Sequence, residues 1–227
     1  RQYRDPIISV QKKNNGTACP SSQTQNCAVD CQYTWGNWGA CSKTCNTGMQ
    51  YRNPIISTTS KNGGAACPST QSQFCNTQAC DVKKMDYQGY GGGSEFEANC
   101  AFSGFLKGFN GGAGWWLNSI GAICNTSQEI GLFGSNTDWQ GNKICNDSGK
   151  MQGVEIAVTD LQQHMVGGVK GICRDGSRPV LGNMDWANNN GSLLKTITCP
   201  AGYSVSGLRG RSGASVDALG IYCTQDP

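Results

Sequence analysis

The chain has 227 residues and a formal net charge of +3, with its charged residues spread along the sequence. This pattern lacks the dense basic patch of a nucleic-acid-binding protein. No apolar run approaches the length of a membrane span. The hydrophobic residues occur in short runs among 32 glycines, which favours short strands and turns over helices. We therefore expect an all-β protein with no nucleic-acid partner and no membrane span.

Fourteen cysteines, an even number, indicate disulfides in a secreted or cell-surface protein. Zinc binding is not expected, because the chain has one histidine, His164, and no Cys-x-x-Cys pair. Four Asn-x-Ser/Thr sequons in polar segments agree with passage through the secretory pathway. These candidate N-glycosylation sites are Asn15, Asn125, Asn146 and Asn190.

No group of residues predicts an enzyme, a cofactor or a metal site. His164 has no evident catalytic partners and is expected to lie in an exposed loop. The cysteines are needed for disulfides, so a thiol nucleophile is not expected. Glu95 and Glu97 follow the alternation of a strand and need no catalytic interpretation.

The N-terminal part of the chain contains a repeat. Residues 2–27 (QYRDPIISVQKKNNGTACPSSQTQNC) return as residues 50–75 (QYRNPIISTTSKNGGAACPSTQSQFC), which indicates repeated structural units. Only the second copy is complete, from about Cys31 to Cys80. We therefore expect a partial unit at residues 1–30 and a complete unit at residues 31–81, at the tail of a longer array.

The complete copy resembles a thrombospondin type 1 repeat over its whole length. The matching residues are Trp35 and Trp38 in a WxxW pattern, the CSKTC segment ending at Cys45, Gly48, Arg52, and the GGxxC ending at Cys67. The resemblance implies a thin three-stranded module with almost no core, held by stacked Trp and Arg side chains and three disulfides. Pro54 stands where a second stacking arginine is usual, so a shorter stack is expected.

The same resemblance implies the disulfide pairs Cys31–Cys67, Cys41–Cys75 and Cys45–Cys80. Cys19 and Cys27 would then pair with cysteines upstream of this chain or with each other. Thr44 matches the family's O-fucose acceptor, and Trp35 and Trp38 match its C-mannose pattern.

Residues 82–227 form the second expected domain and hold a different repeat. Residues 100–124 and 199–223 have the same length, and the glycines at 108, 111, 114 and 121 align with those at 207, 210, 213 and 220. A longer copy spans residues 145–173. In each copy a short strand leads through a loop to a second apolar strand, which is typical of a hairpin.

Each copy begins and ends with a cysteine, which predicts the disulfides Cys100–Cys124, Cys145–Cys173 and Cys199–Cys223. Three hairpins that cannot each bury a face alone should close around a pseudo-threefold axis. The triple repeat, the GYGGGSEF opening and the GASVDALGIY loop resemble the β-prism of jacalin-related lectins and of the vitelline-membrane outer-layer protein.

This second resemblance implies a sugar site. In the lectins, a GxxxD loop and a glycine-rich N-terminal loop together bind carbohydrate, with a carboxylate that accepts hydrogen bonds from neighbouring hydroxyls. Carried over, the carbohydrate-binding residues are Asp217, Gly213, Ala214, Ser215, Gly91, Gly92 and Gly93. A tight turn, in which Asp217 bonds its own backbone, is the structural alternative.

The corresponding loop of the first copy reads GWWLN, residues 114–118. Its paired tryptophans, Trp115 and Trp116, resemble a sugar-stacking platform, although Asn118 replaces the carboxylate. The alternative is that one tryptophan fills the core while its neighbour points outward, as adjacent strand residues do. The second copy, with HMVGG, has neither acid nor turn glycine in place, so no site is expected there.

Two functions fit these features. The first is an extracellular adhesion or carbohydrate-binding protein, in which a thrombospondin-repeat stalk carries a lectin-like prism and the partners are glycans or glycoproteins. The second is a structural glycoprotein of an extracellular matrix, coat or filament, whose partners are other subunits of the assembly.

Overall fold

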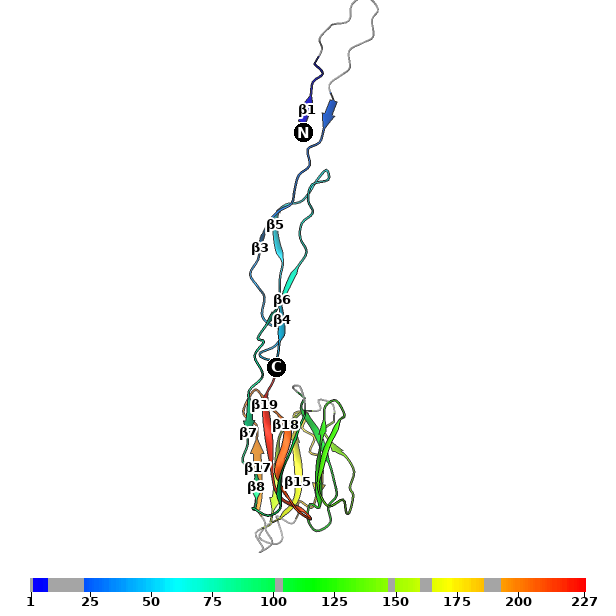
Figure 1. Ribbon diagram of the computed structural model, residues 1–227, viewed down its shortest axis with the longest axis vertical. Helices are drawn as coiled ribbons and strands as arrows, with labels where there is room; N and C mark the ends of the chain where they lie inside the picture. The colour runs from blue at the N-terminus through cyan, green and yellow to red at the C-terminus, as the bar shows by residue number, and fades with distance from the viewer. Residues whose placement is uncertain (1, 8–22, 101–103, 147–149, 160–164, 186–192) are drawn as a thin grey trace, which may run out of the picture. The chain divides into compact units, whose positions relative to one another are not determined.

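The computed structural model describes residues 2–7, 23–100, 104–146, 150–159, 165–185 and 193–227 (Figure 1). In these ranges the chain forms strands and turns and no helix, which confirms the expected all-β class. Contacts divide it into two units. The N-terminal unit comprises Arg1–Ser42 and Gly48–Cys75, and the C-terminal unit comprises Lys43–Thr47 and Asn76–Pro227. Segments 43–47 and 76–80, which the sequence analysis assigns to the complete repeat, thus group with the C-terminal unit.

The N-terminal unit is built from paired short strands. These are β1 (Gln2–Arg4), β2 (Gln23–Gln25), β3 (Gln32–Trp35), β4 (Gly48–Arg52), β5 (Pro54–Thr58) and β6 (Gln71–Cys75). β1 pairs with β2, β3 with β5, and β4 with β6, all antiparallel. β4 and β5 form one strand interrupted at Asn53, so the complete repeat has the three strands that the resemblance implies.

Stacked side chains take the place of a core in this unit. The Arg52 guanidinium lies 4.8 Å from the Trp35 ring centroid and 4.6 Å from that of Trp38, so it stacks on both rings. Its Nε and one terminal nitrogen donate to Gln71 Oε1 at 2.9 and 2.7 Å. The disulfides Cys31–Cys67 and Cys41–Cys75 cross-link residues that flank or end these strands. A module this thin buries little apolar area and depends on such links.

The C-terminal unit consists of three antiparallel sheets, each built around one predicted hairpin. The first-repeat sheet has the order β12-β11-β10-β13, from β10 (Leu106–Asn110), β11 (Ser119–Cys124), β12 (Glu129–Gly134) and β13 (Lys143–Ile144). The second-repeat sheet has the order β16-β15-β14-β17, from β14 (Met151–Val158), β15 (Val166–Cys173), β16 (Val180–Gly182) and β17 (Leu193–Thr198).

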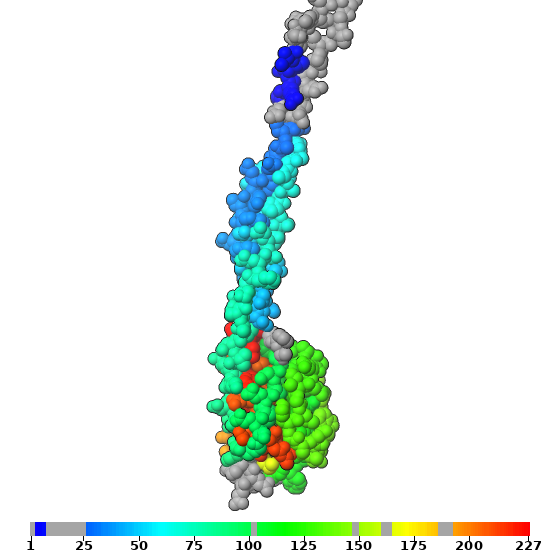
Figure 2. Space-filling view, in the orientation of Figure 1, coloured from blue at the N-terminus to red at the C-terminus, as the bar shows by residue number. Residues whose placement is uncertain are grey.

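The third-repeat sheet joins the two ends of this unit. Its order is β7-β19-β18-β9, and β8 also pairs with β19; the bounds are β7 (Val82–Lys84), β8 (Gln88–Gly89), β9 (Ser94–Asn99), β18 (Tyr203–Ser212) and β19 (Val216–Gln225). The segments around β9 and around β18 and β19 therefore lie side by side on one face (Figure 2). Main-chain hydrogen bonds between these strands therefore join the start of the C-terminal unit to its end.

The core lies between the three sheets. Its fully buried members come from all of them and include Phe109, Ile120, Ile156, Leu208 and Ile221. Each hairpin is closed by the disulfide that the repeat predicts: Cys100–Cys124, Cys145–Cys173 and Cys199–Cys223. A fourth bridge in this unit, Cys45–Cys80, joins the two short segments that group with it.

The hairpin loops of the first and third repeats meet at one end of this unit, which we call the loop end. Leu117 accepts a hydrogen bond from Val216 N at 2.9 Å, and Leu117 N donates to Val166 O at 2.8 Å. Ala214 O accepts from Ser135 N at 3.2 Å. Backbone hydrogen bonds therefore join all three repeats at the loop end.

Candidate functional site

Asp217 lies at the start of β19, where the third-repeat hairpin turns back toward the core. Its neighbours Val216 and Ala218 are fully buried, whereas the Asp217 side chain is half-buried. The carboxylate faces the glycine segment before β9. A β-carbon placed on Gly92 would lie 2.9 Å from Asp217 Oδ1, and one on Gly93 would lie 2.6 Å from Oδ2. The fold therefore brings together the two segments that the sequence analysis singled out.

Backbone contacts fix the glycine segment against the third repeat. Tyr90 N donates to Asp217 O at 3.1 Å. Arg211 holds the next two residues, since its Nε donates to Gly92 O at 2.8 Å and a terminal nitrogen donates to Gly93 O at 2.7 Å. A further nitrogen of Arg211 pairs with Glu95 at 3.2 Å. Arg211 is thus a positioning residue, which the sequence analysis did not assign.

The Asp217 carboxylate is arranged as a hydrogen-bond acceptor. Among the described residues, Asp217 Oδ2 has no hydrogen-bond partner, although it is buried. Burial raises the pKa of Asp217 above its ordinary value, while the Gly213 backbone N–H and the Arg211 charge oppose this rise. A buried acceptor without a partner is costly unless a ligand donates to it. Oδ2 is closed to solvent in this conformation, so a ligand hydroxyl reaches it only if the neighbouring loop shifts.

The other residues of the GASVD loop divide into exposed and buried positions. Gly213 and Ala214 are exposed at the tip, and Ser215 is buried behind them. Gly213 N donates to Ser215 O at 3.0 Å, which closes the turn. Gly213 and Ala214 can contact a ligand, whereas Ser215 supports the loop from inside.

The loop of the first repeat presents one tryptophan to solvent. Trp115 is 73% exposed, Trp116 is half-buried, and Leu117 is fully buried. Neither tryptophan belongs to the core, so the expected alternative of a core tryptophan is wrong. The residues form a turn rather than a strand, with Gly114 N donating to Trp116 O at 3.1 Å. Leu117 therefore fills the inward position.

A carboxylate stands beside this loop that the sequence analysis missed. Asn118 Nδ2 donates to Asp138 Oδ2 at 3.0 Å. Asp138 belongs to the loop between β12 and β13, which occupies the same place in its sheet as the glycine segment before β9 does in the third repeat. The carboxylate absent from the GWWLN loop is thus supplied by a neighbouring loop. Its signal in the sequence was an acid within a polar, glycine-bounded turn.

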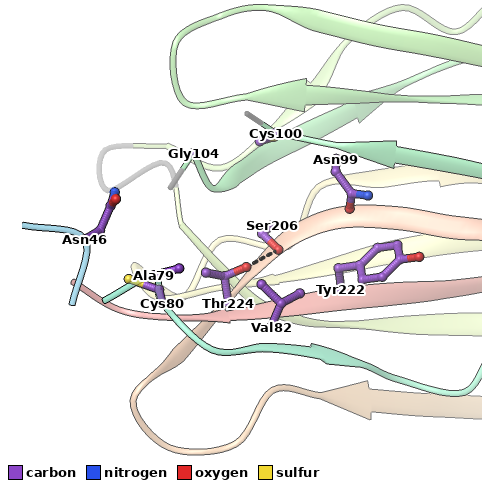
Figure 3. A pocket seen from close by; sticks show the side chains of 10 residues that line it. All are labelled: Asn46, Ala79, Cys80, Val82, Asn99, Cys100, Gly104, Ser206, Tyr222 and Thr224. Carbon is purple, nitrogen blue, oxygen red and sulfur yellow. Dashed lines mark hydrogen bonds between the residues drawn. The ribbon is translucent and has the colours of Figure 1, made fainter. Parts of the chain in front are cut away.

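Another cavity of the C-terminal unit has no carboxylate among its described lining residues. It has a volume of about 360 Å³, and Val82, Ser206, Tyr222 and Thr224 line part of it (Figure 3). Thr224 Oγ1 donates to Ser206 Oγ at 2.7 Å, so this buried polar pair is satisfied. No charged side chain is among the described residues that line the cavity. It is therefore not our candidate site.

Comparison with known proteins identifies the complete repeat. Residues 33–84 match the family model for the thrombospondin type 1 domain. This segment is a thrombospondin type 1 domain. In a comparison with curated proteins, no protein matched the chain.

The C-terminal unit shares its fold with solved structures. Wild-type Malaysian banana lectin superposes with a TM-score of 0.50 at 18% identity, covering 64% of this chain and 100% of the lectin. A variant of that lectin gives a TM-score of 0.51 at 17% identity, covering 64% of this chain and 99% of the variant. A lamprey immune protein gives 0.50 at 17% identity, covering 62% of this chain and 44% of that protein. The C-terminal unit is a β-prism.

The candidate modification sites have the following positions. In the thrombospondin type 1 domain, Trp35 and Trp38 are half-buried, and the Arg52 guanidinium stacks on both rings. Thr44 is exposed, and its hydroxyl donates to Asp226 O at 2.8 Å. In the β-prism, Asn125 and Asn146 are exposed. The remaining candidates, Asn15 and Asn190, lie outside the described residues, as do Cys19 and His164.

Cys27 has no disulfide partner among the described residues.

The described part of the chain contains no helix long and apolar enough to cross a membrane.

Proposed function

We propose that this chain is an extracellular carbohydrate-binding protein whose β-prism binds a sugar at the loop end. In this proposal the thrombospondin repeats are the stalk that carries the prism, and adhesion follows from binding glycans or glycoproteins. The thrombospondin type 1 domain and the six disulfides support an extracellular location, because disulfides persist in oxidising compartments.

One observation carries the proposal. The half-buried Asp217 side chain lies directly against Gly92 and Gly93, which have no side chains to cover its carboxylate. A sugar hydroxyl can donate to a carboxylate oxygen, and a pair of neighbouring hydroxyls can use both carboxylate oxygens. Gly213 and Ala214, with Ser215 buried behind them, would form one wall, and Gly91, Gly92 and Gly93 the other. The shared fold with a protein named as a lectin supports the same function.

The first-repeat loop offers a second set of groups that can bind a sugar. Trp115 offers an exposed aromatic face, Trp116 is half-buried in the same loop, and Asp138 lines one cavity together with Trp115. Sugars bind to aromatic faces through their apolar C–H surface and to carboxylates through their hydroxyls.

The test is a glycan array probed with the full chain. The wild type should bind a defined subset of glycans, and Asp217→Ala should lose that subset. Asp86→Ala is the matched control, because Asp86 is an exposed carboxylate near the same sheet and lies outside the site. No binding by the wild type, or equal binding by Asp217→Ala, would contradict the proposal.

A structural role in an extracellular assembly is the second candidate function. Large apolar side chains are exposed on β4, β5 and β6 of the N-terminal unit: Tyr51, Ile55, Ile56 and Phe74. Exposed apolar groups of this size favour contact with another protein. Light scattering on the purified chain tests this role, and a monodisperse monomer at high concentration would count against it.

A further inference from the structure

The complete repeat of the N-terminal unit has two faces with different chemistry. Neighbouring residues of a strand point to opposite faces, and residues paired across two strands share a face. Trp35 pairs with Pro54. Arg52 pairs with Gln71 and stacks on Trp35, so these four residues share one face, which we call the stack face. Tyr51, next to Arg52 in β4, therefore lies on the opposite face.

This opposite face carries three exposed apolar side chains, Tyr51, Ile55 and Phe74, which we call the apolar stripe. Phe74 pairs with Met49, two residues before Tyr51, so it lies on the same face as Tyr51. Ile55 follows Pro54, which belongs to the stack face, so Ile55 also lies on the opposite face. The three side chains are 55%, 63% and 69% exposed, in chain order. Exposed apolar groups that gather on one face mark interaction sites.

The apolar stripe recurs in the preceding repeat. β1 pairs with β2 in the same register as β4 with β6, so Tyr3 is the counterpart of Tyr51. Ile7 is the counterpart of Ile55, and Tyr3 and Ile7 are 65% and 99% exposed. The third position is polar in this copy, where Asn26 stands. Because the tyrosine and the isoleucine remain exposed in both copies, they are available to a partner outside their own repeat.

The stripe has no charge of its own. Within the described strands β3, β4, β5 and β6, Arg52 is the only charged residue, and it lies on the stack face. Two copies of the stripe can therefore meet without repulsion between like charges. A charged partner would find no complementary group on it. Contact of one surface patch with the same patch of an identical chain is the commonest arrangement in symmetric oligomers.

The area of the stripe determines how strongly one repeat can associate. The exposed parts of Tyr51 and Phe74 offer on the order of 100–150 Å² each, because a buried aromatic side chain removes about 150–250 Å² from water. With Ile55, one repeat offers roughly 350 Å², so two facing repeats bury about 700 Å², below the roughly 1,000 Å² of a stable interface. Tyr3 and Ile7 of the preceding repeat raise the total above this threshold when two repeats of each chain engage.

We propose that the apolar stripe is a self-association surface, through which the thrombospondin repeats of two copies of this chain bind each other. The contact of a single repeat is weak, and the affinity rises with the number of repeats that engage. This inference rests on the assembly role proposed above, and it names the partner and the surface for that role.

The test is sedimentation velocity of the full chain over a wide range of protein concentrations. The wild type should associate reversibly, and Ile55→Ser should raise the dissociation constant of the dimer at least about tenfold. Ile56→Ser is the matched control and should leave association unchanged. Ile56 is the next residue of β5 and is 46% exposed, but it pairs with Tyr33 on the stack face. Combining Tyr51→Ser with Phe74→Ser should leave the chain monomeric, with hydrogen exchange of β3 and β5 unchanged.

Further measurements separate the stripe from other modes of association. Association through an apolar face should persist at high salt, and its loss in salt would overturn the stripe in favour of charged groups. Asp217→Ala should associate like the wild type. Loss of association in that variant would mean that the β-prism holds neighbouring chains by their glycans. That result, or equal association of Ile55→Ser and Ile56→Ser, would overturn the stripe and leave the assembly role standing. A wild type that stays monomeric at every concentration would remove both.

Discussion

Gly92 lies directly against the carboxylate of Asp217, so close that a β-carbon on Gly92 would stand 2.9 Å from Asp217 Oδ1. The two residues are far apart in sequence and are joined through β9, β18 and β19. Arg211 Nε donates to the Gly92 carbonyl and holds it in place. The absence of a side chain at Gly92 is therefore what allows the carboxylate to lie this close to the backbone.

Gly92→Ala should displace the Asp217 carboxylate and weaken sugar binding about tenfold or more. The contact is with the end of a side chain, so the loss of stability should stay below about 1 kcal/mol. Gly91→Ala, in the same wall of the site, separates displacement of the carboxylate from added bulk, because a β-carbon there has no atom within 4 Å. Calorimetric titration with a glycan that binds the wild type measures both variants. Equal affinity in the two variants would show that the carboxylate is not the binding group.

Asp217→Asn should make the fold more stable at neutral pH while it abolishes binding. Burial raises the pKa of Asp217, so its ionisation costs stability in the folded state. That cost is absent below the ordinary aspartate pKa of about 3.9, grows as pH rises, and is complete above the raised pKa. Thermal unfolding of both proteins from pH 3 to 7 should show curves that coincide in acid and separate toward neutrality. A less stable Asn variant at pH 7 would contradict this expectation.

The same titration predicts the pH dependence of binding. Protonation of Asp217 turns one of its oxygens into a donor and removes its charge, so affinity should fall as pH drops through its raised pKa. Affinity that stays constant down to pH 4 would indicate that another group accepts the ligand's hydroxyls.

Asp226→Asn should have the opposite effect on stability. Burial alone would raise the pKa of Asp226, but hydrogen bonds from Ser204 and Arg174 and the charges of Arg174 and Lys150 hold it below its ordinary value. Ser204 Oγ donates to Asp226 Oδ1 at 2.7 Å, and Lys150 Nζ lies 3.6 Å from the same oxygen. The ionised carboxylate is therefore the stabilising form.

The Asn variant should lose about 1–2 kcal/mol of unfolding free energy at pH 7. The difference from the wild type should persist above the ordinary aspartate pKa of about 3.9 and shrink as pH falls below it. Urea unfolding at pH 7 and at pH 3 measures it. A difference that is equal at the two pH values would mean that the charge of Asp226 is not responsible.

Arg52→Ala should unfold the thrombospondin type 1 domain more easily, by about 1–2 kcal/mol, because it removes two cation–π contacts. Arg52→Lys keeps the charge but not the planar stacking, so it should recover only part of the loss. Hydrogen exchange of β3 and β5 reports this domain separately from the β-prism. Unchanged exchange in Arg52→Ala would show that the disulfides alone hold the strands.

The strands and hairpins were largely predictable from the sequence, because cysteine positions and glycine spacing recur with each repeat. Cys100, Cys124 and their counterparts mark the two ends of each hairpin. The apolar runs between them show the alternation of inward and outward residues that is typical of strands. The approach of Gly92 and Gly93 to Asp217 was expected only through the resemblance to lectins. Nothing local to either segment specifies that contact, since it arises when β9 pairs with β18.

The first-repeat loop shows what the sequence alone could not specify. Strand alternation offered a core tryptophan as the alternative to a sugar-stacking pair, but residues 114–117 turn, and Leu117 takes the inward position. Asp138 escaped notice because its contact with Asn118 depends on the β11–β12 pairing and on a left-handed backbone at Asp138. Both are properties of the folded chain.

The affinity of wild-type and Asp217→Ala protein for one array-selected glycan, measured by calorimetry at pH 7, tests the central claim most directly. The substitution removes one partly exposed carboxylate and leaves the disulfides and the core unchanged. We predict at least a hundredfold loss of affinity in Asp217→Ala and none in Asp86→Ala, with both proteins folded by circular dichroism. Unchanged affinity in folded Asp217→Ala would contradict the assignment of this carboxylate as the sugar-binding group.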